Sequence, residues 1–378
     1  MNKILLQKNL LFKSKSKRII ISLWLIPILM VFISGVLIAS TQRQANYADW
    51  YNHWITSIIG IVIAFFLSRI SLEKLRPSIP FIYFLTIISL IGVKLIGVSA
   101  LGAQRWLALG SFNVQPSEFA KLTAILILAS ILDKQKSFSM SNMLRLLIII
   151  VIPWFLVFTQ PDLGTSLVFA SITLTMFYWA DMPFEWILLV LSAIFTALLS
   201  GLFPLSLLIW IPFTGYLAYR SLPRKFLTAS LVMASQAFVS ILTPWLWENA
   251  LQDYQRDRLV LFLDPAKDPL GGGYHLLQSK VGIGSGGFWG TGLLQGELTK
   301  LRFIPEQHTD FIFSALGEEM GFLGTMFVII GFFLLLLILF QVAKGARTDF
   351  ESLIVIGIAS MLMFQVVVNI FMTIGLGP

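Results

Sequence analysis

Long apolar runs follow one another along almost the whole chain and are separated by short polar segments. A run of about 20 apolar residues is long enough to cross a bilayer as a helix. The pattern predicts eleven spanning helices, at roughly 19–40, 53–70, 80–99, 118–133, 143–159, 164–180, 185–203, 205–219, 226–247, 310–341 and 352–376. Short alternating segments typical of a membrane β-barrel are not evident. We therefore predict an all-α polytopic membrane protein whose residues 1–378 form a single transmembrane domain.

Composition strengthens the membrane assignment. Of the residues, 57% are hydrophobic and 12% charged, whereas a soluble domain carries about 25% charged residues. The absence of cysteine excludes disulfides, a thiol nucleophile and a cysteine-ligated metal. The apolar run at 19–39 follows a basic stretch, as in a secretory signal. It is longer than the roughly 7–15 apolar residues of a signal peptide, so we interpret it as the first spanning helix.

Basic residues predict which side of the membrane each polar segment faces. They cluster in the N-terminal segment 1–18 and near helix ends at 74–76, 134–145, 220–225 and 344–347. With the N-terminus in the cytoplasm, all these clusters fall on the cytoplasmic face, as the positive-inside rule requires. The same clusters account for the net charge of +8, so the charge does not indicate a nucleic-acid partner. The outer face then receives 41–52, 102–117, 160–162 and a large extracytoplasmic loop between about 248 and 309.

The first informative outer segment is GAQRWLALGSFNVQPSEFAKL, at 102–122. Arg105 and Trp106 are typical of interfacial anchoring, since both residue types prefer the headgroup zone. Pro116 to Glu118 predict a helix start, and Glu118 and Lys121 then share one helical face. Two interpretations remain open. The Glu118–Lys121 pair is a structural ion pair to a neighbouring helix, or Arg105, Lys121 and the helix N-terminus line a cavity for anionic phosphates.

Other polar residues in apolar surroundings need an explanation too. In QPDLGTS, at 160–166, Asp162 is explained equally well as a helix cap or as a substrate contact. Lys94 can extend its ammonium to the interface. Glu318 and Glu319 are adjacent acids in an apolar segment, so one of them is expected to face the bundle interior.

The longest glycine-dense polar stretch runs from 264 to 310. A non-helical insert of this length between spanning helices indicates chemistry or binding. Prolines after Asp264 and Asp268 move both acids out of helical geometry, and residues 276–283 are compatible with a short re-entrant helix. A serine nucleophile elbow and an HExxH zinc motif are both absent. Of the catalytic arrangements considered, the one that remains is a general base that acts beside cations, which stabilise a leaving group.

Four segments together carry the strongest functional signal: 102–122, QPDLGTSL at 160–167, YQRDRLVLFLDPAKDPLGGGYHLLQSKVGIGSGG at 254–287 and LRFIPEQHTDFIFSALGEEMGFLG at 301–324. Together they resemble the SEDS family, which includes RodA, FtsW and SpoVE, and within it they are most similar to the RodA branch. The resemblance covers nearly the whole chain. The motifs GAQRW, DPLGGGYH and QSK are more similar to RodA than to FtsW.

The resemblance implies a peptidoglycan glycosyltransferase of cell elongation and rod-shape maintenance. Such an enzyme polymerises lipid II, transferring the growing glycan from undecaprenyl pyrophosphate to the 4-hydroxyl of the incoming GlcNAc with inversion. The family's essential loop carboxylate matches Asp268 rather than Asp264, and we expect it to act as general base. The residues expected to bind substrate are Arg105, Trp106, Ser117, Glu118, Lys121, Asp162, His275, Gln278, Ser279, Lys280, Glu306, His308 and Asp310.

The resemblance also implies partners and a location. We expect a class B penicillin-binding protein as transpeptidase partner, other elongation-complex proteins, membrane lipid, and a divalent cation (Mg or Mn) without an organic cofactor. The chain is placed in the bacterial cytoplasmic membrane with its active-site loop outside. A lipid II flippase and a non-catalytic scaffold for the penicillin-binding protein remain alternatives. A flippase would need a polar path to the cytoplasmic face, whereas Glu118, Lys121 and Glu318 all fall in the outer half.

The sequence departs from the family pattern in three places. Residues 296–299 read GELT where relatives have a GTQS-like segment. Two additional apolar segments near 185–219 exceed the family's ten-helix layout. The sequence ends at NIFMTIGLGP without the family's PLP and SYGGS motifs and last helix, so we expect a C-terminal family segment to be missing.

Overall fold

The computed structural model describes residues 2–41, 49–100, 103–109, 112–134, 139–160, 162–249, 256, 272–301, 303 and 306–377. The chain forms two compact units, each assembled from separate stretches of sequence. Unit 1 comprises residues 1–74, 257–345 and 362–378, and unit 2 comprises residues 75–256 and 346–361. The prediction of one transmembrane domain stays a prediction.

Helices occupy all eleven predicted places. They are α1 (Asn2–Thr41), α2 (Asp49–Leu67), α4 (Ile79–Ile96), α5 (Pro116–Leu132), α6 (Met140–Phe158), α7 (Leu163–Trp179), α8 (Phe184–Leu202), α9 (Leu207–Ser221), α10 (Lys225–Asn249), α14 (Ile312–Lys344) and α15 (Asp349–Ile374). Within the described residues, eight helices are long and apolar enough to cross a membrane, and α7 is apolar but shorter. The all-α polytopic fold is confirmed, and the number of eleven crossings stays a prediction.

One helix boundary differs strongly from the prediction. Helix α1 begins at Asn2, well before the apolar run at residue 19, so the basic segment continues the first helix. This segment contains neither glycine nor proline and is rich in leucine and lysine, residue types that favour helix. Hydropathy marks where a helix enters lipid, and it does not mark where the helix itself begins.

Several short elements lie between the long helices. They are α3 (Leu72–Leu75), η1 (Arg76–Ser78), β1 (Val98–Ala100), β2 (Ala103–Leu109), β3 (Phe112–Val114), η2 (Pro204–Ser206), α12 (Gly272–Ser285) and α13 (Glu297–Leu301). Helix α12 confirms the short helix predicted near 276–283. The three-stranded antiparallel sheet, in the order β1-β2-β3, was not predicted. Strands β1 and β3 have three residues each, too few for a period-two pattern.

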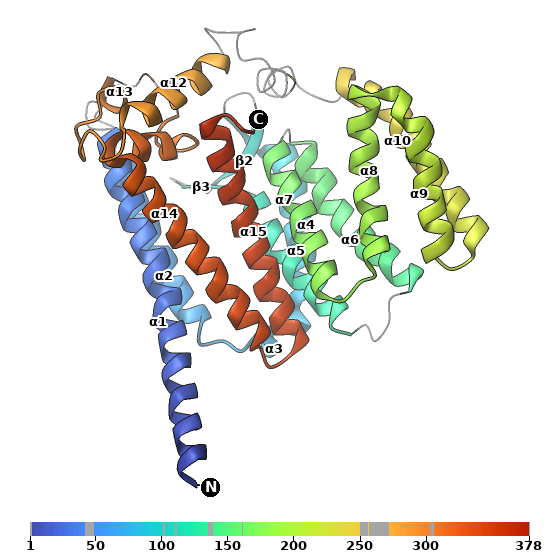
Figure 1. Cartoon of the computed structure of the whole chain (residues 1–378), viewed down its shortest axis with the longest axis horizontal. Helices are drawn as coiled ribbons and strands as arrows, with labels where there is room; N and C mark the ends of the chain where they lie inside the picture. The colour runs from blue at the N-terminus through green and yellow to red at the C-terminus, as the bar shows by residue number, and fades with distance from the viewer. Residues whose placement is uncertain are drawn as a thin grey trace. The chain divides into compact units, whose positions relative to one another are not determined.

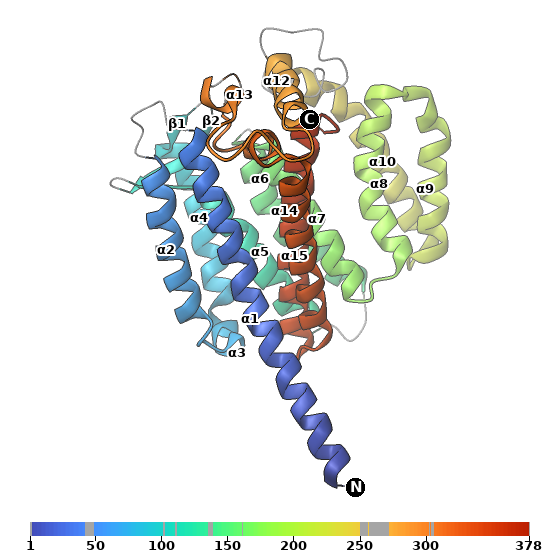
Figure 2. The same cartoon turned by 60° about the vertical axis from the view of Figure 1, so that its left-hand side comes forward.

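Unit 2 contains two groups of packed helices. Helix α5 packs on α4, α6 and α7 and carries a buried face that includes Ala124, Leu128 and Ala129. Helices α8, α9 and α10 pack on one another as a second group, visible at the right of Figures 1 and 2. Inside this group the buried Gln236 binds both Thr196 and Ser192 of α8, donating to the Ser192 hydroxyl at 2.5 Å. Polar groups facing lipid are costly, so these side chains satisfy one another across helices.

Unit 1 is built around α14, against which α1 and α12 pack. Leu37, Phe313 and Leu316 form its buried apolar cluster. Helix α14 is interrupted at Gly321, whose φ of 61° and ψ of −160° are not helical. A side chain at this position would also collide with the Phe288 carbonyl oxygen, 2.8 Å from the position of a Cβ atom. Glycine is therefore required here both for its backbone angles and for close approach.

The interruption in α14 is filled by residues 287–292 of the outer loop. The N–H groups of Phe322 and Leu323 donate to the carbonyls of Gly287 and Phe288, at 3.0 and 3.3 Å. In return, the Glu318 and Glu319 carbonyls accept from the N–H groups of Thr291 and Gly292, at 2.9 and 3.0 Å. A break in a spanning helix is tolerated only when protein satisfies the freed backbone groups. The outer loop supplies those partners and is thereby fastened to α14.

Candidate active site

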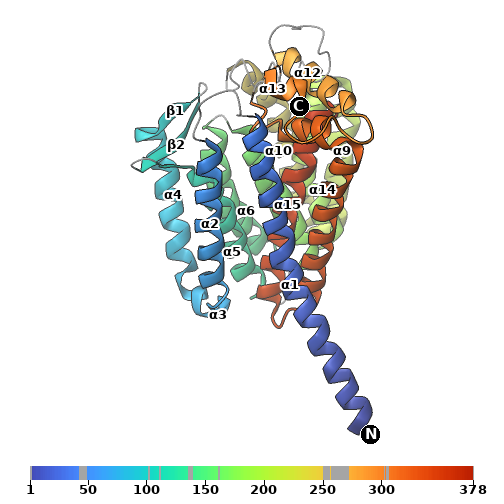
Figure 3. The ribbon, with the colours of Figure 1, turned by 90° about the vertical axis from the view of Figure 1, so that its left-hand side faces the viewer.

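The small sheet of unit 2 carries Arg105 and Trp106 on β2, beside the end of α4 (Figure 3). Arg105 donates through Nε to the carbonyl oxygen of Gln160 at 3.3 Å. The Gln160 side chain is buried and donates in turn to the Leu90 carbonyl at 3.0 Å. The outer segments 102–122 and 160–166, expected to share one face, are therefore in contact. This contact fixes Arg105 against the segment that precedes α7.

Asp162 joins the starts of two helices. It caps α7, because Oδ1 accepts from the Thr165 N–H at 3.1 Å. Its second oxygen, Oδ2, accepts from the Gln115 side-chain amide at 3.2 Å, and Gln115 is the residue preceding Pro116 at the N-cap of α5. The capping interpretation is confirmed, and the role in substrate binding stays a prediction. Proline at the first position of α5 is confirmed as well.

Glu118 and Lys121 form an ion pair within α5. The Lys121 Nζ lies 2.7 Å from Glu118 Oε2 and 2.8 Å from Oε1. The lysine side chain is 1% exposed and the glutamate side chain is 51% exposed. The ion pair itself is confirmed, with both partners in the first turns of α5, whereas its role in packing or in anion binding stays a prediction. Within the described part of the chain, the buried Lys121 ammonium is thus paired with an acid that reaches solvent.

Ser117 lies about one turn before Lys121 on α5 and is also buried, at 1% exposure. Its Oγ makes no hydrogen bond to any residue that the structure describes. Buried hydroxyls in native proteins are nearly always hydrogen-bonded, so an unsatisfied one needs an explanation. Ser117, Lys121 and the positive end of the α5 dipole together make a site suited to an anion.

The part of the large loop that the structure describes begins with α12 in unit 1. Ser279 is fully buried, and its hydroxyl lies 2.5 Å from the Ser314 hydroxyl and donates to the Thr373 carbonyl at 2.6 Å. It thus binds α12 to α14 and α15. His275 stacks on Phe311 with ring centroids 6.2 Å apart, whereas Lys280 is exposed and Gln278 partly buried. Of these four residues predicted to bind substrate, Ser279 therefore uses its hydroxyl for hydrogen bonds within the protein.

The turn before α14 holds the last three predicted ligands. Glu306 is exposed with a φ of 51° and accepts from the Thr309 hydroxyl at 3.3 Å. Asp310 is exposed and its carbonyl accepts from the Asn369 amide at 3.0 Å, while His308 is partly buried. Among the described residues, no group of three histidine or acidic side chains is arranged to hold a metal ion. Asp268 and Asp264 lie outside the described residues.

Glu318 and Glu319 are both buried, at 1% exposure each, whereas the sequence predicted only one inward-facing acid. Glu318 accepts from the Leu298 and Thr299 N–H groups at 2.8 and 2.9 Å and from the Thr299 hydroxyl at 2.6 Å. Glu319 accepts from the Ser40 hydroxyl and from the Leu294 N–H. Glu318 thus caps the N-terminus of α13 from another helix. Both acids hold the outer loop, a role for which spacing in the sequence gives no signal.

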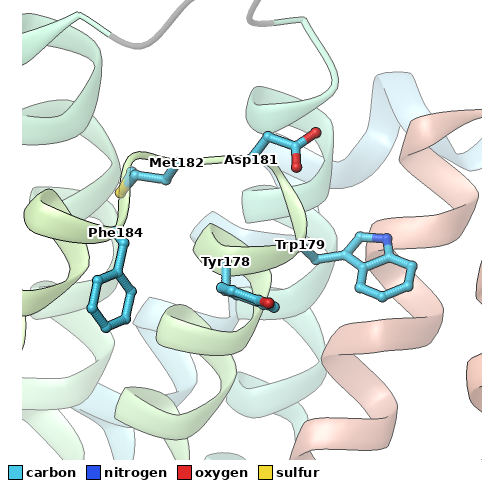
Figure 4. A pocket seen from close by; sticks show the side chains of 5 residues that line it. All are labelled: Tyr178, Trp179, Asp181, Met182 and Phe184. Atoms are coloured by element: carbon cyan, nitrogen blue, oxygen red, sulfur yellow. The ribbon is translucent and has the colours of Figure 1, made fainter.

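A cavity of about 460 Å³ lies at the other end of α7, lined by Tyr178, Trp179, Asp181, Met182 and Phe184 (Figure 4). Trp179 donates from Nε1 to the Ser352 hydroxyl at 2.8 Å. The cavity contains none of the predicted ligands and is separated from Asp162 by the whole length of α7. It does not belong to the candidate active site.

Comparisons with known proteins agree on one family. The family described as cell cycle protein, FtsW/RodA/SpoVE, matches residues 14–209 and 206–378. Peptidoglycan glycosyltransferase MrdB of Escherichia coli K12 is 35% identical over 85% of this chain and 75% of its own length. Peptidoglycan glycosyltransferase RodA of Treponema pallidum is 32% identical over 93% of this chain and 87% of its own length. A solved peptidoglycan synthase complex contains a chain of similar fold, with a TM-score of 0.70, 26% identity, and coverage of 94% of this chain and 87% of that one.

Proposed function

This chain belongs to the FtsW/RodA/SpoVE family, and from that membership we infer that it is a multi-pass membrane enzyme, a peptidoglycan glycosyltransferase. The observation that carries this conclusion is the match to two curated peptidoglycan glycosyltransferases over at least 85% of the chain. Its apolar helices agree with a membrane location. The substrate, the stereochemistry and the roles of individual residues are parts of the proposal.

We propose lipid II as the substrate. The 4-hydroxyl of the incoming GlcNAc attacks the anomeric carbon of the growing glycan from the face opposite the pyrophosphate. The new glycosidic bond forms as the bond to pyrophosphate breaks, which inverts the configuration. The proton of the attacking hydroxyl passes to Asp268, and undecaprenyl pyrophosphate departs with the bonding electrons. General-base assistance of this kind contributes typically about 10²–10⁴-fold to a rate.

The positive end of α5 is the proposed site for the pyrophosphate. Lys121 is buried next to the unsatisfied Ser117 hydroxyl, and Arg105 is held close to the same outer segments by Gln160. Pre-positioned positive groups stabilise the charge that develops on a leaving group without reorganising during the reaction. Glu118, half-exposed, holds the Lys121 ammonium in place. Trp106 on β2 is proposed to pack on a sugar or on the isoprenoid.

A divalent cation remains part of the proposal. Mg²⁺ is commonly bound by one or two carboxylates together with substrate phosphates, so a cluster of three protein ligands is not required. The pyrophosphate oxygens would hold it, and the ion would neutralise phosphate charge.

A class B penicillin-binding protein is the proposed partner. The similar solved chain was determined in a peptidoglycan synthase complex whose description couples polymerisation to crosslinking. A transpeptidase bound to this chain would crosslink the strands as they form. We place the active-site loop outside the cytoplasm, because crosslinked peptidoglycan is assembled there and because the basic segments predict this orientation.

The direct test is polymerisation of labelled lipid II by the purified full chain in detergent, alone and with a class B penicillin-binding protein. We expect glycan ladders on gels when the partner is present. Lipid II left intact under both conditions, with a related enzyme active in parallel, would contradict the glycosyltransferase and favour a scaffold. Transbilayer movement of lipid II in vesicles without polymer would favour a flippase.

Lys121→Met is expected to lower lipid II polymerisation by about 10²-fold, the typical cost of removing one positive donor from a transition state. The loss should fall on kcat more than on KM, because the charge on pyrophosphate grows as the bond breaks. Lys94→Met is the matched control, since Lys94 is an exposed lysine near the end of α4. Equal activity of the two variants would remove Lys121 from the proposed mechanism.

A further inference from the structure

A groove in unit 1 lies between α1 and α2, and its lining includes none of the residues proposed for the active site. Its volume is about 730 Å³, and it is lined by Trp24, Ile61, Val62, Phe65, Phe66, Ser68 and Arg69. Apolar and polar side chains line different parts of the groove. Five apolar side chains come first along the helices, and Ser68 and Arg69 follow at the end of α2. Among the described residues that line the groove, none carries a carboxyl group.

Near one end of the groove the two antiparallel helices are joined by specific contacts. There the Ser34 hydroxyl lies 3.2 Å from His53 Nε2, and Gly35 allows Trp54 to pack directly on α1. Trp24 lies about three turns and Ile61 about two turns away from these contacts. In that region the side chains of α2 are largely exposed, with Val62 and Phe65 each at 48%. The helix pair thus leaves an apolar channel that opens toward Arg69.

Arg69 occupies the polar end of the groove with its charge available. Its guanidinium carbon lies 4.7 Å from the centroid of the Phe65 ring, which orients the group over the groove. No ion pair or side-chain hydrogen bond joins the Arg69 guanidinium to another residue in the described part of the chain. Its donors can therefore bind a phosphate in the two-pronged geometry that guanidinium favours.

We propose that this groove is a binding site for an anionic phospholipid. An acyl chain packs along Trp24, Ile61 and Phe65, and the headgroup phosphate binds Arg69 with Ser68 beside it. The order of apolar and cationic groups along the groove matches the order of chain and phosphate in a phospholipid. An anionic headgroup is favoured over a zwitterionic one, because the lining contains no acid to bind an ammonium. A bound lipid would fill the channel and hold α1 against α2.

The test is native mass spectrometry of the full chain in detergent, titrated with phosphatidylglycerol, with phosphatidylcholine and with glycerol 3-phosphate. We expect phosphatidylglycerol to bind most tightly, and Arg69→Gln to weaken it about fivefold, as for one basic residue at a membrane surface. Ile61→Trp, which fills the groove and keeps Arg69, should also reduce binding. Both positions contact lipid or solvent, so the fold is expected to persist, as size-exclusion profiles will verify.

Arg220→Gln is the matched control, because Arg220 is another exposed arginine at a helix end. Its binding of phosphatidylglycerol should equal that of the unmodified chain. Equal affinity of Arg69→Gln and Arg220→Gln would overturn the site. Binding of glycerol 3-phosphate as tight as that of phosphatidylglycerol would overturn the lipid assignment and indicate a site for free phosphate esters.

Discussion

Asp268→Asn is expected to abolish polymerisation of lipid II by the purified chain and its partner, with a loss of about 10²–10⁴-fold. The amide keeps the shape of the side chain and cannot accept the proton of the attacking hydroxyl. Binding of lipid II should change little, because positive groups at α5 are proposed to hold the pyrophosphate. Gels of fluorescent glycan products measure the rate, and a filter-binding assay measures lipid II affinity.

The matched control is Asp264→Asn, since Asp264 also precedes a proline in the same loop, four positions earlier. We expect this variant to retain most of its activity. Retained activity of Asp268→Asn would remove Asp268 as general base. Equal loss in both variants would indicate that the loop needs its overall charge and that no single carboxylate takes the proton.

Glu318→Ala is expected to release the outer loop from α14. The substitution leaves two N–H groups and one hydroxyl of α13 without their acceptor in a buried place. Each donor left without a partner costs about 1–3 kcal/mol, so the docked loop should lose roughly 3 kcal/mol or more. Hydrogen exchange should show faster exchange at Leu298 and Thr299, with little change in α5 or α7.

Glu306→Ala is the control for this experiment, because Glu306 is exposed and binds only within its own turn. It should leave the exchange of Leu298 and Thr299 unchanged. Unaltered exchange in Glu318→Ala would contradict the role of Glu318 in holding α13. Faster exchange spread evenly over all helices would indicate global destabilisation, which the local hydrogen bonds do not predict.

The helices could be predicted because their signals are local. Apart from the start of α1, every end of the eleven long helices lies within four residues of the prediction. Length and hydropathy locate an apolar helix without reference to the rest of the chain. Pro116 and Asp162 likewise act within one turn of their own helices, so their positions at helix starts were visible in the sequence.

The candidate site was only partly predictable, because its contacts join distant residues. The hydrogen bond from Arg105 to Gln160 spans 55 positions, and that from Gln115 to Asp162 spans 47. Sequence reasoning placed these segments on one face but gave no partner for any side chain. Ser279 was expected to bind substrate, whereas its buried hydroxyl binds Ser314 and the carbonyl of Thr373, 94 positions away. The choice of Asp268 came from family resemblance, since two Asp-Pro pairs cannot be distinguished by spacing alone.

The sequence by itself determined that this protein crosses the membrane repeatedly as helices, and where those helices lie, because burying apolar runs in lipid dominates the energetics of each segment. Only the tertiary structure decided how the polar residues between and within them are used. It turned Glu318 and Glu319 inward onto the loop, broke α14 at Gly321 to receive residues 287–292, and buried Lys121 in its pair with Glu118. A polar group in an apolar surrounding must find a partner, and which partner it finds depends on segments that only folding brings together.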